Sequence, residues 1–360
     1  MRVLAEIGVA EDMIAAGSIS ESFDFCSRSG RKIGSINRNM VQRFGQPAVN
    51  MRRSTLLEAI VNRAWCENVE LRFEKRLARI EDRADQPVVA HFTDGSIAEG
   101  DFLIGADGVH SIVRQHVIPD GPRPFDTGLI GFGGFVPRSL IENTGIGQRI
   151  EATFGKSGFF GYGFCSPDPQ NGAMWWSTQP SRGLAAAAYR AMDQETIRRH
   201  LLDFHAGWHE PIPSILHAAE NIGVTDTLDV ATLPVWSRGR TLLIGDAAHA
   251  TSPHAGQGAS LALEDAMKLG CLMQEGRELD ETFQAFERQR RGRAERIVAI
   301  ARRNGNSKRE LSAIGAWIRD RMFKMLIPIT SQGMDFMYAY DAGNLTPRPE
   351  TSGPRDRQAA

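Results

Sequence analysis

The sequence has few cysteines, and none of them is arranged for a disulfide framework or a metal site. Cys26, Cys66, Cys165 and Cys271 form no C-x-x-C pair and have no zinc-ligand spacing with histidine. Four scattered cysteines in a chain of this length are typical of buried thiols in a reducing compartment. We therefore expect no structural zinc site, no other metal site and no disulfide-stapled secreted fold.

Long apolar runs and net charge are also lacking. No apolar run approaches a length of about 18 residues, which a membrane span requires. The N-terminus has no basic segment followed by an apolar one, so it predicts no signal peptide. Lys plus Arg total 42 against 43 Asp plus Glu, which gives no broad positive field to capture nucleic acid. These absences predict a cytoplasmic protein without a membrane span and without a nucleic-acid partner.

The chain has ample apolar material for a buried core. With 360 residues, of which 42% are hydrophobic, it is long enough for two domains, or for one large domain with a subdomain. Hydrophobic periodicity predicts helices over residues 2–16, 52–66, 184–206, 257–274 and 280–304. Ser54 or Thr55 is the expected N-cap of the second. The basic run from Arg288 to Arg296 in the last is interpreted as a solvated face with i,i+4 partners at Glu287 and Glu295.

Short strands are expected between these helices, at residues 69–73, 88–92, 102–104 and 241–245. Asp94-Gly95 closes the second strand into a hairpin. The third and fourth strands are continuous apolar runs, as in buried parallel sheets. Residues 125–180 are dense in glycine and aromatic residues, with regular turn signals, which favours an antiparallel sheet.

The strongest chemical signal is the string RTLLIGDAAHATSPHAGQGASLALED, residues 240–265. An apolar strand ends at Gly245-Asp246, and a loop of small residues with Pro253 leads to Gly256-Gln257-Gly258, which opens a helix. Glycines let the backbone approach a ligand closely, and a helix N-terminus directs free N–H groups and a positive dipole end at it. An acidic residue at the carboxyl end of a strand can accept hydrogen bonds from ligand hydroxyls. The string therefore predicts a site for an anionic or dipolar ligand.

Three motifs in order resemble those of one enzyme family. The string at 240–265 resembles the second FAD-binding motif of the single-component (group A) aromatic flavoprotein monooxygenases, the para-hydroxybenzoate hydroxylase-like fold. DFLIGADGVHSIVR, residues 101–114, resembles the D-G motif of the same family. VNMRRSTLLEA, residues 49–59, resembles the segment that supplies an arginine to the flavin. The resemblance extends from residue 1 to about residue 305.

The resemblance implies cofactors and site residues. Asp246, after Gly245, would bind the flavin ribityl chain or pyrophosphate. Pro253 and the loop Gly256, Gln257 and Gly258 would lie beside the isoalloxazine ring, where the helix stabilises negative charge. Asp107 and Gly108 would help hold FAD and are linked in this family to NAD(P)H use. Arg53 would lie near the ribityl or pyrophosphate oxygens.

The resemblance also implies a fold and a domain organisation. We expect an α/β (α+β) fold, with an incomplete doubly wound, Rossmann-like FAD-binding domain and an inserted antiparallel β-sheet substrate domain. The FAD-binding domain would comprise residues 1–120 and 230–305, and the substrate domain 121–229. A C-terminal helical segment over 306–340 and a disordered tail over 341–360 would follow.

Several residues near these motifs keep two interpretations. His249 and His254 could act as general bases, but packing roles are favoured for both. The aromatic residues from Phe154 to Trp176 could form a substrate-pocket wall or a sheet core, because alternation alone cannot decide between the two. We expect no side chain to act as a nucleophile, because the cofactor carries the chemistry.

The sequence departs from the family pattern at its start. The family's first strand and helix carry G-x-G-x-x-G, and no such motif is present; Gly8 and Gly17 follow no predicted strand. Residues 1–17 resemble the helix after that unit, so a βαβ unit of about 30 residues or more is expected to be absent. One explanation is a start codon inside a longer reading frame, which is favoured because the other motifs are intact; the other is a shortened protein. In either case we expect weak FAD binding by this chain alone and an exposed sheet edge.

The predicted function is an FAD-dependent monooxygenase that uses NAD(P)H and O2 on an aromatic or polyketide-like small molecule. Two alternatives stay open at this point: a flavin-dependent dehydrogenase or reductase of the same fold, and a non-catalytic flavoprotein remnant. Substrate identity, the choice between NADH and NADPH, and oligomeric state are not determined by the sequence.

Overall fold

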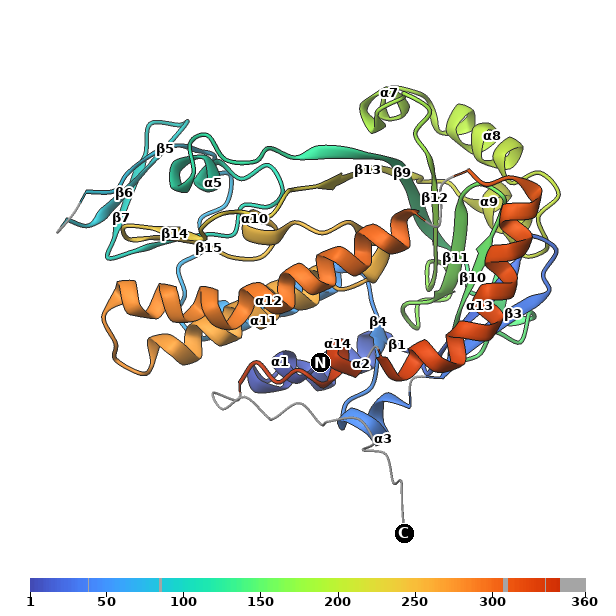
Figure 1. Cartoon of the computed structure of the whole chain (residues 1–360), viewed down its shortest axis with the longest axis horizontal. Coiled ribbons are helices and arrows are strands. Elements are labelled where there is room, and N and C mark those ends of the chain that lie inside the picture. The colour runs from blue at the N-terminus through green and yellow to red at the C-terminus, as the bar shows by residue number, and fades with distance from the viewer. Residues whose placement is uncertain (38, 84–85, 307–309, 334, 344–360) are drawn as a thin grey trace, which may run out of the picture.

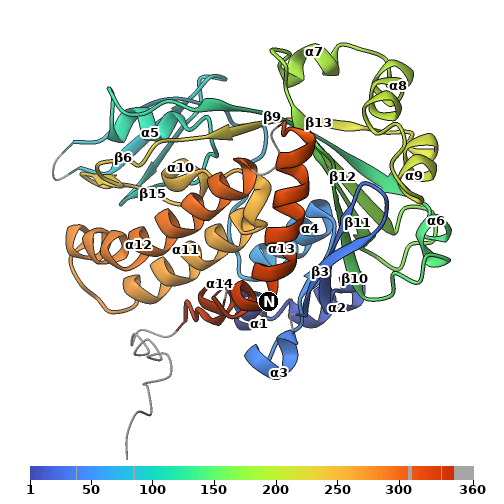
Figure 2. The same cartoon turned by 45° about the vertical axis from the view of Figure 1, so that its right-hand side comes forward.

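Two sheet-containing parts lie side by side in the structure, a computed structural model that describes residues 1–343 except 38, 84–85, 307–309 and 334 (Figure 1). A large twisted sheet forms one part, and two small sheets with their helices form the other (Figures 1 and 2). The predicted mixed α/β class is confirmed. None of the helices in the described part of the chain has the length and hydropathy that a membrane span requires.

A three-stranded sheet lies at the centre of the cofactor-type part. Its order is β14 (Ser237–Arg238), β15 (Thr241–Leu243), β8 (Leu103–Gly105). β15 and β8 run parallel, as their continuous apolar sequences predicted, and Leu242 and Leu243 are fully buried. β8 is the edge strand of this sheet within the described residues.

Helices that precede and follow β15 in the sequence pack around this sheet. α11 (Gly258–Met273) and α12 (Leu279–Asn306) contact each other along their lengths, and α5 (Ile112–Val117) packs on β15. Their apolar residues form a core with Trp236, Phe283 and Phe286. The predicted helices over 257–274 and 280–304 are confirmed to within two residues at their ends.

A second small sheet is antiparallel, in the order β5 (Leu77–Glu81), β6 (Val88–Phe92), β7 (Ile97–Gly100). The hairpin between β6 and β7 turns at Asp94-Gly95 as predicted, with Gly95 at φ 83°. The strand predicted over 69–73 is wrong. These residues are in no regular element, and Val69 and Phe73 are 50% and 63% exposed, since no neighbouring strand pairs with them.

The N-terminal segment differs in detail from the prediction. Residues 2–16 form two helices, α1 (Arg2–Glu6) and α2 (Ala10–Ala16), because Gly8 adopts φ 77° and breaks the periodic pattern. α4 (Arg53–Cys66) confirms the helix predicted over 52–66. Its expected N-cap is wrong: the chain is still extended at Arg52, which is the N-cap residue, and no side chain caps the helix.

The large sheet has seven strands in the order β13-β9-β12-β11-β10-β2-β3. Their bounds are β13 (Gly223–Asp229), β9 (Phe125–Val136), β12 (Ala173–Pro180), β11 (Phe159–Phe164), β10 (Arg149–Phe154), β2 (Ser22–Ser27) and β3 (Lys32–Asn37). The sheet was expected from residues 121–229 and in antiparallel form. It also includes β2 and β3 from the N-terminal region, and β2 runs parallel to β10, because β10 has a free edge that the extended segment 22–27 completes.

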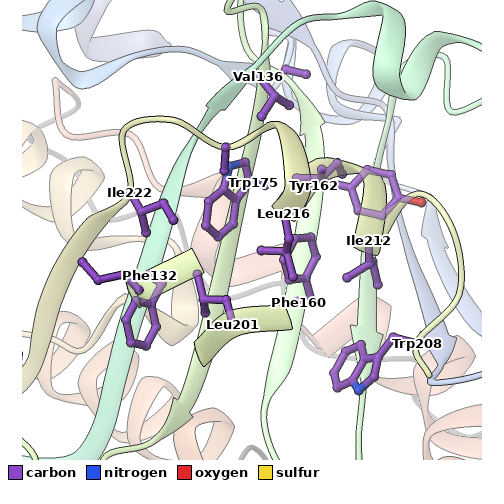
Figure 3. Close-up of a cluster of buried hydrophobic side chains, with 14 of the residues drawn as sticks. Phe132, Val136, Phe160, Tyr162, Trp175, Leu201, Trp208, Ile212, Leu216 and Ile222 are labelled. Carbon is purple, nitrogen blue, oxygen red and sulfur yellow. The ribbon is translucent and has the colours of Figure 1, made fainter. Parts of the chain in front are cut away.

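Helices cover one face of the large sheet. These are α6 (Ser139–Glu142), α7 (Ala186–Arg190), α8 (Gln194–Phe204) and α9 (Ile212–Ala218). The single helix predicted over 184–206 is divided into α7 and α8, because Asp193 caps the second by accepting a hydrogen bond from the Thr196 N–H. Figure 3 shows Phe160, Trp175 and Leu201 packed between the sheet and these helices, in the largest hydrophobic core.

The opposite face of the large sheet is covered in part by α13 (Ala313–Gly333), as Figure 2 shows. The C-terminal region expected to be helical contains α13 and α14 (Asp335–Ala339). The tail predicted over 341–360 lies outside the described residues from 344 onward. Five small elements complete the described fold: β1 (Ser18–Ile19) paired with β4 (Val49–Asn50), α3 (Met40–Phe44), α10 (Asp246–His249) and the 3-10 helix η1 (Pro253–Ala255).

Gly161 provides a test of the large sheet. A Cβ added at Gly161 would lie 2.4 Å from the indole of Trp176, which packs across β11. We expect Gly161→Ala to lower the free energy of unfolding by about 1–3 kcal/mol, since the ring must move. Gly270→Ala is the matched control, because nothing lies within 4 Å of an added Cβ there. Urea unfolding of both variants measures this, and an equal effect in both would contradict the packing described here.

Candidate functional site

Strand β15 leads directly into the Gly245-Asp246 turn. Gly245 has φ 56° and ψ −142°, a backbone conformation that is essentially restricted to glycine. A Cβ at this position would also approach the Cβ of Ala262 in α11 to 3.2 Å. Because α10 begins at once, Asp246 lies just beyond the carboxyl end of the strand, where parallel α/β sheets bind ligands.

Asp246 presents an accessible carboxylate at this turn. Crowding by the surrounding chain desolvates the group and raises the pKa of Asp246 above its ordinary value, while the charges of His249 and Arg53 and a backbone hydrogen bond from Thr251 oppose the rise. An exposed carboxylate that has already lost part of its hydration gains more from hydrogen-bond donors of a ligand than one in bulk water.

The loop after α10 is open at its glycines. η1 ends at Gly256, which has φ 62°, and a Cβ added there would meet nothing within 4 Å. α11 then begins at Gly258 with Gln257 as its N-cap residue, and no side chain caps its first turn. A helix of 16 residues therefore presents uncapped N–H groups and its positive dipole end at this loop.

The D-G motif follows β8 and serves a structural purpose. The Asp107 carboxylate accepts hydrogen bonds from the backbone N–H of Ile112 at 2.7 Å and of Val113 at 3.1 Å, and from the Ser111 hydroxyl. It thereby fixes the start of α5. Gly108 has φ 81° and open space where a Cβ would be, so the backbone there is accessible.

Arg114 joins the D-G motif to the Gly245-Asp246 turn. Its guanidinium is buried and donates hydrogen bonds to the carbonyl oxygen of Ala247 at 3.1 Å and to that of Val109. This side chain therefore adds a direct link between two motifs that are more than 130 residues apart in the sequence and that follow paired strands.

The two arginines at the start of α4 point to different parts of the molecule. Arg53 is exposed, and its charge acts on Asp246 across the site. Arg52 donates a hydrogen bond to the carbonyl oxygen of Asn171 at 2.8 Å and lies over the ring of Phe135, 4.5 Å from its centroid. Arg52 thus holds the N-terminus of α4 against the large sheet.

Sequence reasoning missed the buried charges behind this site. Asp265 and Arg290 have no exposed side-chain surface, and Arg290 Nε donates to Asp265 Oδ1 at 2.7 Å. His249 Nε2 lies 2.6 Å from Asp265 Oδ2, and its ring packs on Trp236. His249 is therefore buried, as a packing residue should be, but it also belongs to a polar network.

The interpretation of residues 288–296 as a solvated helix face is wrong for two of its arginines. Arg290 is buried, the side chain of Arg293 is largely buried, and both bind Glu264 of α11. Arg291 does form the predicted i,i+4 pairs with Glu287 and Glu295. The faces of α12 differ because one of them packs on α11, and a charged residue in a helical repeat does not reveal this packing. The available signal was the spacing of Arg290 and Arg293, which are three residues apart and so lie on the same face of α12.

His254 lies in η1 and packs against the end of α12. A Cβ added at Gly305 would lie 2.6 Å from its ring and 3.6 Å from Leu129 of β9. The loop before α11 therefore lies where the cofactor-type part meets the large sheet.

The aromatic residues of the large sheet divide between its two faces. Phe160, Tyr162, Phe164 and Trp175 belong to the core under α7–α9. Phe154, Phe159 and Trp176 lie on the opposite face with Phe25. Alternate residues of a strand point in opposite directions, so these aromatic residues pack on both faces of the sheet. Phe154 and Phe159 are buried on the second face, with Phe323 of α13 packed against them.

The residues present fit a flavin dinucleotide in part of its length. Open backbone at Gly108 and Gly256, an uncapped helix N-terminus, an accessible carboxylate and a nearby arginine match a group with hydroxyls, phosphates and an electron-accepting ring. No group of three or more His, Cys, Asp or Glu residues that could hold a metal ion occurs within the part of the chain that the structure describes.

The raised pKa of Asp246 predicts a stability effect. In the pH range between the ordinary pKa of an aspartate and the raised pKa of Asp246 in the folded protein, Asp246 is deprotonated in the unfolded chain but still protonated in the folded one. Folding therefore becomes less favourable as pH rises through this range. Above this window the penalty is constant. We expect Asp246→Asn to raise the free energy of unfolding of the ligand-free protein at pH 7 by less than about 1 kcal/mol, because exposure screens the effect. Urea unfolding at pH 3 and pH 7 measures it. A gain that is absent at pH 7 or equal at pH 3 would contradict this account.

Comparison with known proteins agrees with this geometry. The FAD binding domain family matches residues 1–301. The chain is 31% identical over 287 residues to the FAD-dependent urate hydroxylase of Klebsiella oxytoca, a match that covers 76% of this chain and 68% of the relative. It is 26% identical over 367 residues to the 6-hydroxynicotinate 3-monooxygenase of Bordetella bronchiseptica, covering 95% and 83%.

Solved structures show the same fold. The structure of Klebsiella pneumoniae HpxO complexed with FAD and uric acid has a TM-score of 0.83 and 25% identity, and the match covers 96% of this chain and 86% of that one. A salicylate hydroxylase substrate complex has a TM-score of 0.74. The family predicted from the three motifs is confirmed: the chain belongs to the FAD-dependent aromatic hydroxylases that share this FAD-binding domain.

Proposed function

We propose that this chain is an FAD-dependent monooxygenase that uses NAD(P)H and O2 to hydroxylate a small aromatic or polyketide-like molecule. The observation that carries the proposal is the convergence of the uncapped N-terminus of α11, the accessible Asp246 carboxylate and the exposed Arg53 at the junction with the large sheet. When bound and reduced, FAD supplies the activation of O2.

The chain's own residues have separate tasks in this proposal. Asp246 accepts hydrogen bonds from the hydroxyl groups of the cofactor, and the N–H groups at Gly258 stabilise negative charge on its ring. Arg53 provides a fixed positive charge for the ribityl or phosphate oxygens. Asp107 acts mainly through α5, whose start it caps, and Gly108 leaves the backbone open.

The face of the large sheet opposite α8 and α9 is the proposed substrate wall. Phe135 is 42% exposed on this face, and Trp176 is half-buried there. Arg52 contacts Phe135 and directly precedes Arg53, so this wall and the proposed cofactor arginine are neighbours. Exposed rings favour a flat aromatic substrate through stacking and exclude water from the reacting atoms. The relatives named for urate and 6-hydroxynicotinate support a small ring compound of this kind.

Three further parts of the proposal rest on the family and the sequence. The electron donor is NAD(P)H. The chain works in the cytoplasm, which is supported by its four free cysteines. The third part, that FAD binding by this chain is weak, stays a prediction.

Flavin binding and oxygen consumption test the function directly. We expect the purified protein to bind FAD, as measured by quenching of flavin fluorescence at rising protein concentration, and to consume O2 with NAD(P)H faster when FAD and a substrate are present. Urate and 6-hydroxynicotinate, for which the two relatives are named, are the first ring compounds to supply, and analysis of the products shows whether the ring is hydroxylated. Flavin reduction without substrate oxygenation would replace the proposal with a dehydrogenase or reductase. A chain that binds no flavin would contradict its catalytic part.

Arg53 can be tested against a second arginine of the same helix. We expect Arg53→Ala to raise the Kd for FAD by about tenfold, because a charge-assisted contact is lost at the site. Arg63→Ala is the control, since Arg63 lies nearly three turns further along α4 and pairs with Glu67. Quenching of flavin fluorescence gives both constants. Equal changes in the two variants would show that Arg53 has no specific role.

A further inference from the structure

One oxygen atom of Asp265 holds both ends of the turn that carries Asp246. Asp265 Oδ2 accepts a hydrogen bond from the backbone N–H of Gly245 at 2.9 Å, and His249 Nε2 lies 2.6 Å from the same oxygen. Gly245 precedes α10 and His249 is its last residue. The four-residue helix is therefore closed by a single acceptor from α11, and the direction of the Asp246 side chain depends on it.

The other oxygen of Asp265 is occupied as well. Arg290 Nε donates to Oδ1, and neither side chain has any exposed surface. Burial alone would raise the pKa of Asp265, but the hydrogen bond and charge of His249, the charge of Arg290 and the Gly245 N–H hold it below its ordinary value. The carboxylate is thus ionised and accepts from three groups at once, which are the conditions for strong hydrogen bonds.

A further contact fixes the middle of the turn. The buried guanidinium of Arg114 donates to the Ala247 carbonyl oxygen at 3.1 Å. The turn is therefore held at its start, middle and end by side chains of α11 and α5. None of these contacts requires a bound ligand. A ligand that binds here does not have to order the turn, so the loss of conformational entropy on binding is smaller.

We propose that Asp265 is a positioning residue that preorganises the Asp246 turn for FAD. It does not touch the cofactor, and it acts through Gly245 and His249. The inference rests on the proposed binding of FAD at Asp246. It adds that the affinity of this site depends on a buried residue that lies 19 positions further along the chain and whose charge is neutralised by Arg290.

Glu264 provides a matched comparison within the same helix. It directly precedes Asp265, is largely buried and accepts a hydrogen bond from the same Arg290 at 2.9 Å. Its remaining partner is Arg293, and it makes no hydrogen bond to α10 among the described contacts. Asp265→Asn and Glu264→Gln each remove one of the two carboxylates that pair with Arg290. Only Asp265→Asn also disturbs the turn.

The first measurement is hydrogen exchange of the peptide 244–250 in the ligand-free protein, followed by mass spectrometry. We expect Asp265→Asn to speed exchange of this peptide by about tenfold or more, while Glu264→Gln leaves it unchanged. The second measurement is the Kd for FAD, which we expect to rise about tenfold in Asp265→Asn only. The free energy of unfolding from urea titration, which falls in both variants, separates the local effect from a general loss of stability.

Equal exchange and equal Kd in the two variants would overturn the proposal, because Asp265 would then be a structural ion-pair residue only. If the unaltered chain binds no FAD, the proposed function fails for this chain, but the exchange comparison still decides whether Asp265 orders the turn.

A second pair of variants keeps the test possible if Asp265→Asn does not fold. His249→Ala removes one donor to Oδ2 and leaves the Asp265–Arg290 pair intact, whereas His249→Gln keeps a side-chain N–H donor. We expect faster exchange of the peptide 244–250 in His249→Ala and partial recovery in His249→Gln. Unchanged exchange in His249→Ala would count against a role for this oxygen in closing the turn.

Discussion

The buried carboxylate of Asp265 is the interaction on which the cofactor-type part of the molecule depends. Removing an ionised carboxylate and a guanidinium from water costs several kcal/mol each, and their attraction offsets this only when hydrogen bonds satisfy the remaining positions. Here Asp265 accepts from Arg290, His249 and the Gly245 backbone. Such an arrangement contributes little net stability compared with apolar packing, but it specifies one relative placement of α11, α12 and the turn after β15.

Arginines make several long-range connections, and those of Arg302 and Arg52 join the two parts. Arg302 of α12 binds the buried Asp229, the last residue of β13, through both of its side-chain oxygens, and the carbonyl oxygen of Val230 at 2.8 Å. Arg52 reaches the large sheet from α4, and Arg114 reaches the turn from α5. A planar guanidinium can serve several acceptors in a fixed geometry, which makes it suited to such junctions. The site lies where these junctions hold the two parts together.

Local sequence predicted the elements that position the site more accurately than their surroundings. β8, β15, α11 and α12 were found because continuous apolar strands and long helical repeats are strong signals. Errors occurred where a single glycine or capping residue decided the outcome, as at Gly8 and Asp193. The strand expected over 69–73 failed because a strand needs a partner, and none pairs with that segment in the described structure.

The sequence alone determined the family, the cofactor and the residues of the two motifs around Gly245 and Asp107. These depend on short-range patterns: a strand end, a glycine that permits an unusual backbone angle, and a helix start. Only the tertiary structure decided that Arg290 is buried while Arg291 is not, that β2 and β3 complete the large sheet, and which aromatic residues face the junction. The physical reason is that the burial of a side chain depends on what packs against its element, and segments distant in the sequence supply that partner.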